Sequence, residues 1–225
     1  MAFQSIVEQK ICSRDFPYLQ PYFYNHPYAL RCELGIGDTT EAYMENARKR
    51  ALEIYHILFS DGADAIMYNY WMSDDCDSGD AHCNQYESYE DFQEILQNRI
   101  ERKTEQLVFL AKYQYKYRHK TVRDLQTYDE PGDELYGIQR RNRMIFYSDG
   151  IGFDFADLIE REFDPNLGYE VSFVSFKNEC IFSVYDDRGC DVVFMTAEKM
   201  RQFYYLLQPY FLEYDIEEMK RRFQG

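Results

Sequence analysis

The chain has 225 residues, 45% of them hydrophobic, with 22 Tyr and 17 Phe beside a single Trp. Its formal net charge of −15 argues against nucleic acids and anionic membrane surfaces as partners, because both attract proteins with an excess of Lys and Arg. No apolar run approaches the roughly 18 residues of a membrane span, and six cysteines are too sparse for a disulfide scaffold in a chain of this length.

The N-terminal residues 1–27 are predicted to form an aromatic, proline-rich arm ahead of one folded domain, residues 28–225. Three prolines stand among six aromatic residues in 16–28, and repeated Pro forbids a regular helix. The arm is therefore expected to adopt extended or turn geometry and to pack on the domain. The start lacks a cationic region followed by an apolar stretch, so the protein is expected to stay in the reducing cytoplasm.

Residues 28–34 alternate as a half-buried strand, with Leu30, Cys32 and Leu34 facing inward and Arg31 and Glu33 facing outward. Apolar residues then recur at helical spacing over 44–58. The spacing of an aspartate at 38 and a glutamate at 41 predicts a helix cap just before it. A second strand is predicted over 63–71, so that strand, helix and strand form a crossover unit.

Negative charge is concentrated in residues 60–98, which contain ten acidic residues and no Lys or Arg. The polar part near 73–87 is predicted to be an inserted loop. Four aspartates of this loop are the candidate residues for partner binding: Asp74, Asp75, Asp77 and Asp80. Clustered carboxylates attract cations, so the expected partner is a basic protein.

The same loop combines carboxylates with Cys76, His82 and Cys83, which are possible metal donors. The spacing does not fit an EF-hand, and adjacent His and Cys do not resemble the paired short spacings of structural zinc sites. We therefore predict a solvated acidic loop, with no metal and no cofactor.

The remaining elements complete the predicted domain. A helix is predicted from 88 to about 123, although the pattern leaves the type of the 104–123 segment open. It is followed by a strand at 143–148, a helix at 155–163, a strand at 171–176 and helices at 197–207 and 216–223. This order predicts an α+β fold with a single mixed or mostly antiparallel sheet and helices packed on it.

Residues 179–195 are the firmest local prediction, a β-hairpin. Alternation places Cys180, Phe182 and Val184 on one face of the first strand, and both faces of the hairpin are largely apolar. It is therefore expected in the interior of the sheet. Cys180 and Cys190 could face each other across it, as reduced core residues or as a disulfide, and the reduced state is favoured.

The predicted hairpin turn has the sequence Asp186-Asp187-Arg188-Gly189, in which Gly189 could adopt a positive φ. Asp191 follows on the return strand. Three carboxylates could therefore gather around the guanidinium of Arg188. The turn residues Tyr185, Asp186, Asp187, Arg188, Gly189 and Asp191 are the second group of candidate site residues.

Three stretches resemble an uncharacterised bacterial family, the domain of unknown function 3885. They are Tyr-Asp-Asp-Arg-Gly-Cys-Asp-Val at 185–192, Leu-Arg-Cys-Glu-Leu-Gly at 30–35 and Arg-Ala-Leu-Glu-Ile at 50–54. The resemblance covers most of residues 28–223. It implies a bacterial, intracellular origin, and it carries over no catalytic residue.

Three functional hypotheses follow. The first is a non-enzymatic, acidic protein-binding domain, an immunity or antitoxin type of partner for a basic bacterial protein such as a toxin. The second is a metal-assisted hydrolase that uses the carboxylates near the 186–191 turn. The third is a structural domain without a ligand. The charge pattern favours the first.

Overall fold

The computed structural model describes residues 22–73, 118–122, 141–149, 153–163 and 169–224, together with four helical residues at 93, 97, 100 and 104. Seven strands lie within these residues: β1 (Ala29–Glu33), β2 (Ala65–Ser73), β3 (Arg118–Val122), β4 (Arg141–Asp149), β5 (Tyr169–Ser175), β6 (Cys180–Asp186) and β7 (Gly189–Phe194). They form one sheet in the order β1-β7-β6-β5-β2-β4-β3. Every pair of neighbours is antiparallel.

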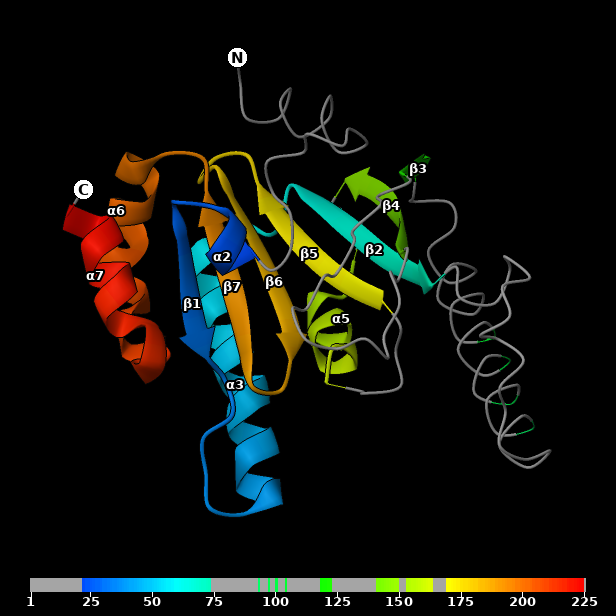
Figure 1. The fold of residues 1–225 in the computed structure, drawn as a ribbon, viewed down its shortest axis with the longest axis horizontal. Helices are drawn as coiled ribbons and strands as arrows, with labels where there is room; N and C mark the ends of the chain where they lie inside the picture. Colours follow the sequence, from blue (N-terminus) through cyan, green and yellow to red (C-terminus); the bar gives the residue numbers. More distant parts are fainter. Residues whose placement is uncertain are drawn as a thin grey trace, which may run out of the picture.

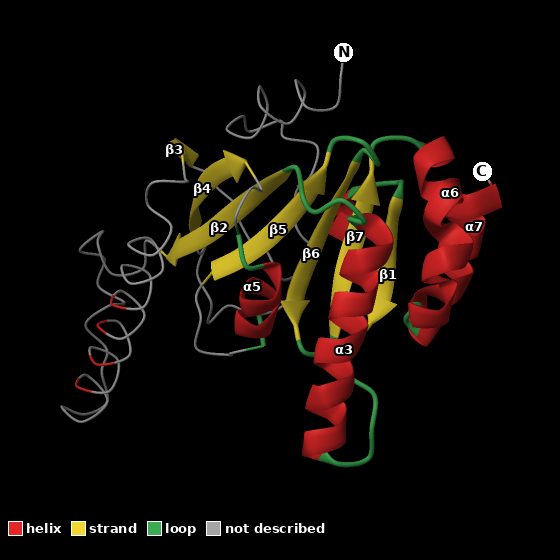
Figure 2. Ribbon diagram, turned by 180° about the vertical axis from the view of Figure 1, so that it is seen from behind, coloured by secondary structure: helices red, strands yellow, loops and turns green. Residues whose placement is uncertain are grey.

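Helices pack on both faces and along one edge of this sheet. The described helices are α2 (Tyr22–Asn25), α3 (Thr40–Leu58), α5 (Phe155–Arg161), α6 (Ala197–Leu207) and α7 (Ile216–Gln224). The short helix α2 lies on one face (Figure 1), α3 and α5 cover the other (Figure 2), and α6 and α7 run beside the β1 edge. The predicted α+β fold is confirmed.

The crossover β1–α3–β2 spans the sheet. Four antiparallel steps separate β1 from β2, so the two strands point in the same direction, and α3 returns the chain between them. The helix begins one residue later than predicted. Thr39 is the N-cap, and its Oγ1 accepts a hydrogen bond from Ala42 N at 3.2 Å, in place of the predicted cap at Asp38.

The hairpin β6–β7 is confirmed and occupies the interior of the sheet, between β5 and β1. Phe182 pairs with Val192, and Cys180 pairs with Phe194. All six residues of β7 are buried. Leu30 belongs to the same core, which also takes in apolar side chains from α3, α5 and α6.

One local prediction was wrong. Residues 118–122 form strand β3, which pairs with β4 instead of continuing a helix; the β-branched Thr121 and Val122 suit a strand, and pairing decides the ambiguous segment. In the arm, residues 22–25 form a single helical turn between the prolines at 21 and 27. Tyr22 and Phe23 of this turn are buried.

Candidate functional site

Arg31 of β1 and Asp191 of β7 form a buried ion pair. They lie directly opposite each other, with Arg31 Nε 3.0 Å from Asp191 Oδ1 and Arg31 Nη2 3.4 Å from Oδ2. Arg31 is 8% exposed and Asp191 is 1% exposed. The prediction that Arg31 faces solvent was wrong, because α2 covers this face of the sheet and removes the guanidinium from water.

The ion pair continues into a row of polar side chains that crosses the sheet beneath α2. Asp191 lies opposite Ser183, and Ser183 lies opposite Ser172. The two serine hydroxyls are 3.1 Å apart, and the Tyr22 hydroxyl is 3.3 Å from Ser172 Oγ. Asp191 Oδ2 also accepts a hydrogen bond from Phe23 N at 3.0 Å. Buried polar bonds therefore hold α2 in place, in addition to its apolar contacts.

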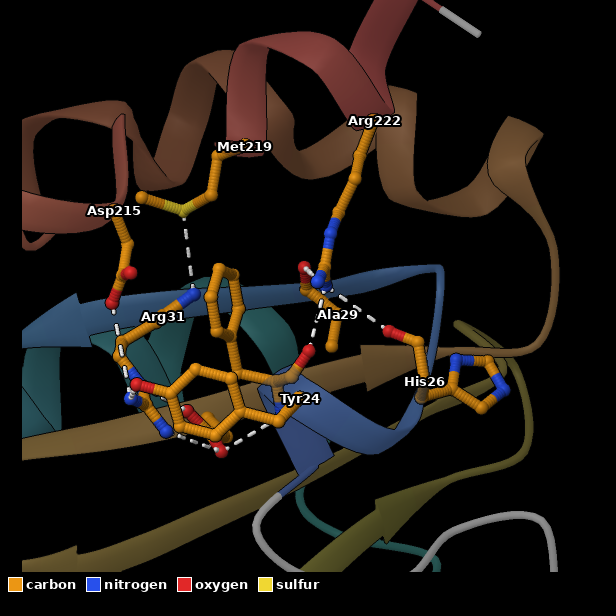
Figure 3. Close-up of polar contacts among 9 residues, drawn as sticks. Tyr24, His26, Ala29, Arg31, Asp215, Met219 and Arg222 are labelled. Carbon is orange, nitrogen blue, oxygen red and sulfur yellow. Dashed lines mark hydrogen bonds and ion pairs between the residues drawn. The ribbon is translucent and has the colours of Figure 1, made fainter. Parts of the chain in front are cut away.

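Three aromatic rings lie close to the Arg31 guanidinium, and Figure 3 shows one of them, that of Tyr24. Its central carbon lies 4.5 Å from the ring centre of Tyr24, 5.0 Å from that of Phe23 and 5.5 Å from that of Tyr185. The Tyr24 hydroxyl accepts a hydrogen bond from Arg31 Nη1 at 2.9 Å. A planar guanidinium suits this environment because it stacks on rings while its edges bond to a carboxylate.

A second carboxylate approaches Arg31 from the C-terminal segment. Asp215 Oδ2 lies 3.8 Å from Arg31 Nη1 (Figure 3), and Asp215 is 6% exposed. Within the described part of the chain, Asp215 Oδ2 is the buried side-chain atom that lacks a hydrogen-bond partner. Burial raises the pKa of Asp215, and the charges of Arg31 and Arg222 oppose the rise.

Burial and neighbouring charges also have opposite effects on the pKa values of Asp191 and Arg31. Burial raises the pKa of Asp191, although the hydrogen bond and charge of Arg31 work against it. For Arg31, burial is the largest single cause and favours a lower pKa, but the hydrogen bond and charge of Asp191, together with Tyr185 and Tyr24, raise the pKa overall. Burial is also the main cause of the raised pKa of Tyr185. Both oxygens of Asp191 already accept hydrogen bonds from within the protein, so this carboxylate has a structural role.

The predicted cluster of three carboxylates around Arg188 does not form. Arg188 Nε bonds to Asp186 Oδ2 at 2.8 Å, and the Arg188 side chain is 77% exposed. Asp191 is bonded to Arg31 instead. Asp187 lies in the turn between β6 and β7 and shifts the pKa of Arg188 upward, behind the larger effect of Asp186. Asp186 is therefore bonded to Arg188, whereas Asp191 is bonded to Arg31.

Gly189 is needed for space and not for a positive φ. The described glycines with positive φ are Gly37 and Gly62, and Gly189 is a strand residue paired with Asp186. A Cβ on Gly189 would lie 2.1 Å from the Tyr185 hydroxyl oxygen. The register shifts at Tyr185, which turns this ring over the glycine.

Cys190 faces Cys32 and not Cys180. Cys32 and Cys190 lie opposite each other on β1 and β7, and their thiols share a hydrogen bond. Cys32, Cys180 and Cys190 are all free and buried. Burial raises the pKa of Cys180 and of Cys190, which keeps both in the unreactive thiol form.

The predicted partner-binding residues Asp74, Asp75, Asp77 and Asp80 lie outside the described residues, as do Cys76, His82 and Cys83. Two other acids of the 60–98 segment are described, and both have partners. Asp61 Oδ2 is 2.8 Å from Lys177 Nζ, and Asp64 Oδ2 accepts a hydrogen bond from Phe176 N at 2.6 Å. These two acids therefore do not contribute to an unmatched acidic patch.

A groove of about 490 Å³ lies between the α2 turn and α7. Arg222 is one of the residues that line it and donates from Nη1 to the carbonyls of Phe23 at 2.8 Å, His26 at 3.1 Å and Ala29 at 3.3 Å (Figure 3). It also bonds to Glu218 through Nε at 2.7 Å. Arg222 is thus used to hold α7 against the arm and β1.

The described residues contain no group of three or more His, Cys, Asp or Glu side chains that could hold a metal ion. The strongest ionic cluster, at Arg31, is enclosed by side chains and internally paired. Its arrangement stabilises the junction of α2, β1, β7 and the C-terminal segment and presents no nucleophile or base to solvent.

The sequence reading missed the joint role of Arg31 and Asp191. A usable signal was present, because Asp191 stands in the middle of an apolar strand predicted to be interior. A buried carboxylate needs a cation or several donors, and Arg31 on another apolar strand was available. Which strand lay beside β7 could not be known from local pattern.

The fold and this site define an α+β domain in which a buried arginine on an antiparallel sheet contacts both α2 and the C-terminal segment. The family model described as "Domain of unknown function (DUF3885)" matches residues 9–215, so the chain belongs to this family. The match includes Arg31, Asp191 and Asp215 and ends before α7.

No curated protein and no solved structure matches the chain. Among the described residues, no helix is both long enough and apolar enough to cross a membrane.

Proposed function

We propose that the protein is a non-enzymatic binding domain whose acidic segment docks a basic protein, as an immunity-type partner docks a toxin. The observation that carries this proposal is the segregation of charge, ten acids and no Lys or Arg in residues 60–98. Asp61 and Asp64 are bonded within the domain, so the proposal rests on the other acids of this segment, which lie outside the described residues. In this proposal, Asp74, Asp75, Asp77 and Asp80 form the centre of the contact.

The described surface supports a binding role in a second way. Tyr24, Tyr205 and Tyr214 are 62%, 65% and 88% exposed. Tyrosine supplies large, rigid contact area and is enriched in protein interfaces. Complementary charge would mainly speed association, and aromatic contacts would supply affinity.

The arrangement of the ionisable groups favours binding over hydrolysis. Of the carboxylates proposed for a hydrolase, Asp191 is buried and paired with Arg31, while Asp186 is paired with Arg188. A shared divalent ion would need both to be released. We place the protein in the cytoplasm, where the facing thiols of Cys32 and Cys190 stay reduced.

The test takes the proteins encoded by the genes next to this one, selects any with a net positive charge, and measures its association with this chain. In one variant the four aspartates at 74, 75, 77 and 80 become Lys. We expect its association rate at low salt to fall by about tenfold or more, and the difference to shrink at high salt.

The control reverses four exposed acids that lie on separate elements of the domain: Asp38, Glu45, Glu198 and Glu213. Both variants change the net charge equally. An unchanged rate in the first variant, or an equal loss in the control, removes the acidic segment as the docking site.

A further inference from the structure

β1 is an edge strand, and its pairing with β7 shows which backbone groups point outward. Phe194 N donates to Tyr28 O, and Leu34 N donates to Arg188 O, each at 2.9 Å. Hydrogen-bonded pairs alternate along an antiparallel ladder. The residues whose backbone groups point away from β7 are therefore Ala29, Arg31 and Glu33.

Residues 211–224, the C-terminal cover, occupy most of this outward edge. Arg31 N donates to Met219 Sδ at 3.4 Å, and Arg31 O accepts from Leu212 N at 3.2 Å. Ala29 O accepts from Arg222 Nη1 at 3.3 Å. The remaining outward carbonyl, that of Glu33, accepts from Arg50 Nε of α3 at 2.8 Å. A single isolated bridge, Cys32 to Phe211, takes the place of a paired strand.

The cover packs on α6 through aromatic rings, where Tyr204 contacts Phe211 and Phe223, and it is joined to β1 by a small number of polar contacts. Its helix α7 has nine residues, fewer than the roughly 12–15 that an isolated helix needs, so it depends on docking. Met219 is its fully buried side chain, and its sulfur is a weak acceptor for Arg31 N. Arg222 supplies the main polar anchor. Such a segment can open locally while the sheet stays folded.

The uncovered strand would complement a second copy of itself. In an antiparallel pairing that sets Arg31 opposite Glu33 of the second copy, the two opposite charges meet twice by symmetry. Lifting the cover removes Asp215 from Arg31, and Glu33 of the second copy would replace it. Cys32 would then face Cys32 of the second copy at a non-hydrogen-bonded pair, with Cα atoms about 4.5 Å apart, within disulfide range.

We propose that the β1 edge is a pairing surface for a second copy of this chain, and that the C-terminal cover blocks it until the cover lifts. Unpaired backbone groups of an edge strand can bind another strand. Met219 and Arg222 of α7 contact these groups on β1 and so keep a second strand away from them.

The experiment compares two full-length double variants. Met219→Ala with Arg222→Ala removes the side-chain contacts that these two residues of α7 make with the backbone of β1. Lys220→Ala with Arg221→Ala changes two residues of the same helix that are exposed. Sedimentation across a concentration series should show the first variant dimerising at a concentration at least tenfold lower than the control and the unmodified chain.

Cross-linking identifies the contact. With Cys12, Cys76 and Cys83 replaced by Ser, diamide should join two copies through Cys32: the diamide takes up the two thiol hydrogens, and one S–S bond forms. Adding Cys32→Ser should abolish the cross-link. A first variant that stays monomeric, or that dimerises without a Cys32-dependent cross-link, overturns the proposal.

Hydrogen exchange tests the unmodified chain, in case the first variant does not fold. The Arg31 amide bonds to the cover, whereas those of Leu30 and Cys32 point toward β7. We expect the Arg31 amide to exchange at least tenfold faster than its two neighbours, because the cover lifts while the β1–β7 ladder stays closed. Equal exchange of all three amides contradicts a detachable cover.

Discussion

Arg31 and Asp191 occupy a non-hydrogen-bonded pair of the β1–β7 ladder, flanked by the bonded pairs 28/194 and 34/188. At a non-hydrogen-bonded pair the two Cα atoms are only about 4.5 Å apart, so the two side chains lie closer together than at a hydrogen-bonded pair. The ion pair therefore joins two strands that lie 160 residues apart in the chain. It also lies where α2 and the C-terminal segment meet the sheet.

Removing Asp191 should destabilise the fold strongly. Asp191→Ala leaves the Arg31 guanidinium buried without its carboxylate, and we expect a loss of about 3–5 kcal/mol in the free energy of unfolding. Urea denaturation measures it. Asp186→Ala breaks the exposed pair with Arg188 and serves as the control, with an expected loss below about 1 kcal/mol. Equal losses would mean that Arg31 is not buried as described.

Replacing both charges should recover much of the stability. In Arg31→Met with Asp191→Leu, apolar side chains of similar volume replace the central pair. Asp215 loses its ion pair with Arg31 and keeps the nearby charge of Arg222, so the recovery is expected to be partial. We expect the double variant to be more stable than either single variant by about 1–3 kcal/mol. Additive losses in the double-mutant cycle would show that the two side chains act independently.

Gly189→Ala should destabilise the β6–β7 hairpin. The new Cβ would lie 2.1 Å from the Tyr185 hydroxyl oxygen and 2.9 Å from the Cys32 carbonyl oxygen, so the ring or the strand must move. We expect a cost of about 1–3 kcal/mol. Combining it with Tyr185→Leu, which removes the ring, should reduce the cost. If the cost is the same without the ring, the glycine is required for another reason.

Stability should fall in mild acid because of His26. Burial first, and then the charge of Arg222, lowers the pKa of His26 from 6.5 to about 4. The unfolded chain therefore binds this proton more readily between pH 6.5 and 4, so stability falls as the pH drops through that window and this loss is complete below about 4. After allowance for partial exposure, we expect a loss of about 1–2 kcal/mol.

The measurement is the urea midpoint at pH 7, 6, 5 and 4 for the unmodified chain and for His26→Gln. The glutamine does not titrate but can still accept the hydrogen bond that Tyr28 N gives to His26 Nδ1 at 3.2 Å. The difference between the two curves isolates His26 from the buried carboxylates. Parallel curves over this range would contradict the lowered pKa.

Glu179→Gly should stabilise the protein. Glu179 has φ of 51° in the turn before β6 and is the described non-glycine residue in this left-handed region. A Cβ makes that conformation costly, and glycine removes the clash at some cost in unfolded-state entropy. We expect a net gain of about 0.5–1 kcal/mol in thermal or urea unfolding. Glu198→Gly, within helix α6, should lower stability by a similar amount.

The sequence by itself determined the elements whose signals are local. Two-residue alternation and a short turn predicted the β6–β7 hairpin, and helical spacing predicted α3, α6 and α7. The α+β class followed from the order of these elements. Each prediction needed only residues within about one element of each other.

Only the tertiary structure decided which residues face one another. Arg31 is buried because α2 and the C-terminal segment cover its face, although its own strand reads as half-exposed. Cys190 meets Cys32 because β1 and not another strand lies beside β7. The order of the strands, and which segments cover each face of the sheet, depend on contacts between residues far apart in the sequence. Local periodicity does not encode these contacts.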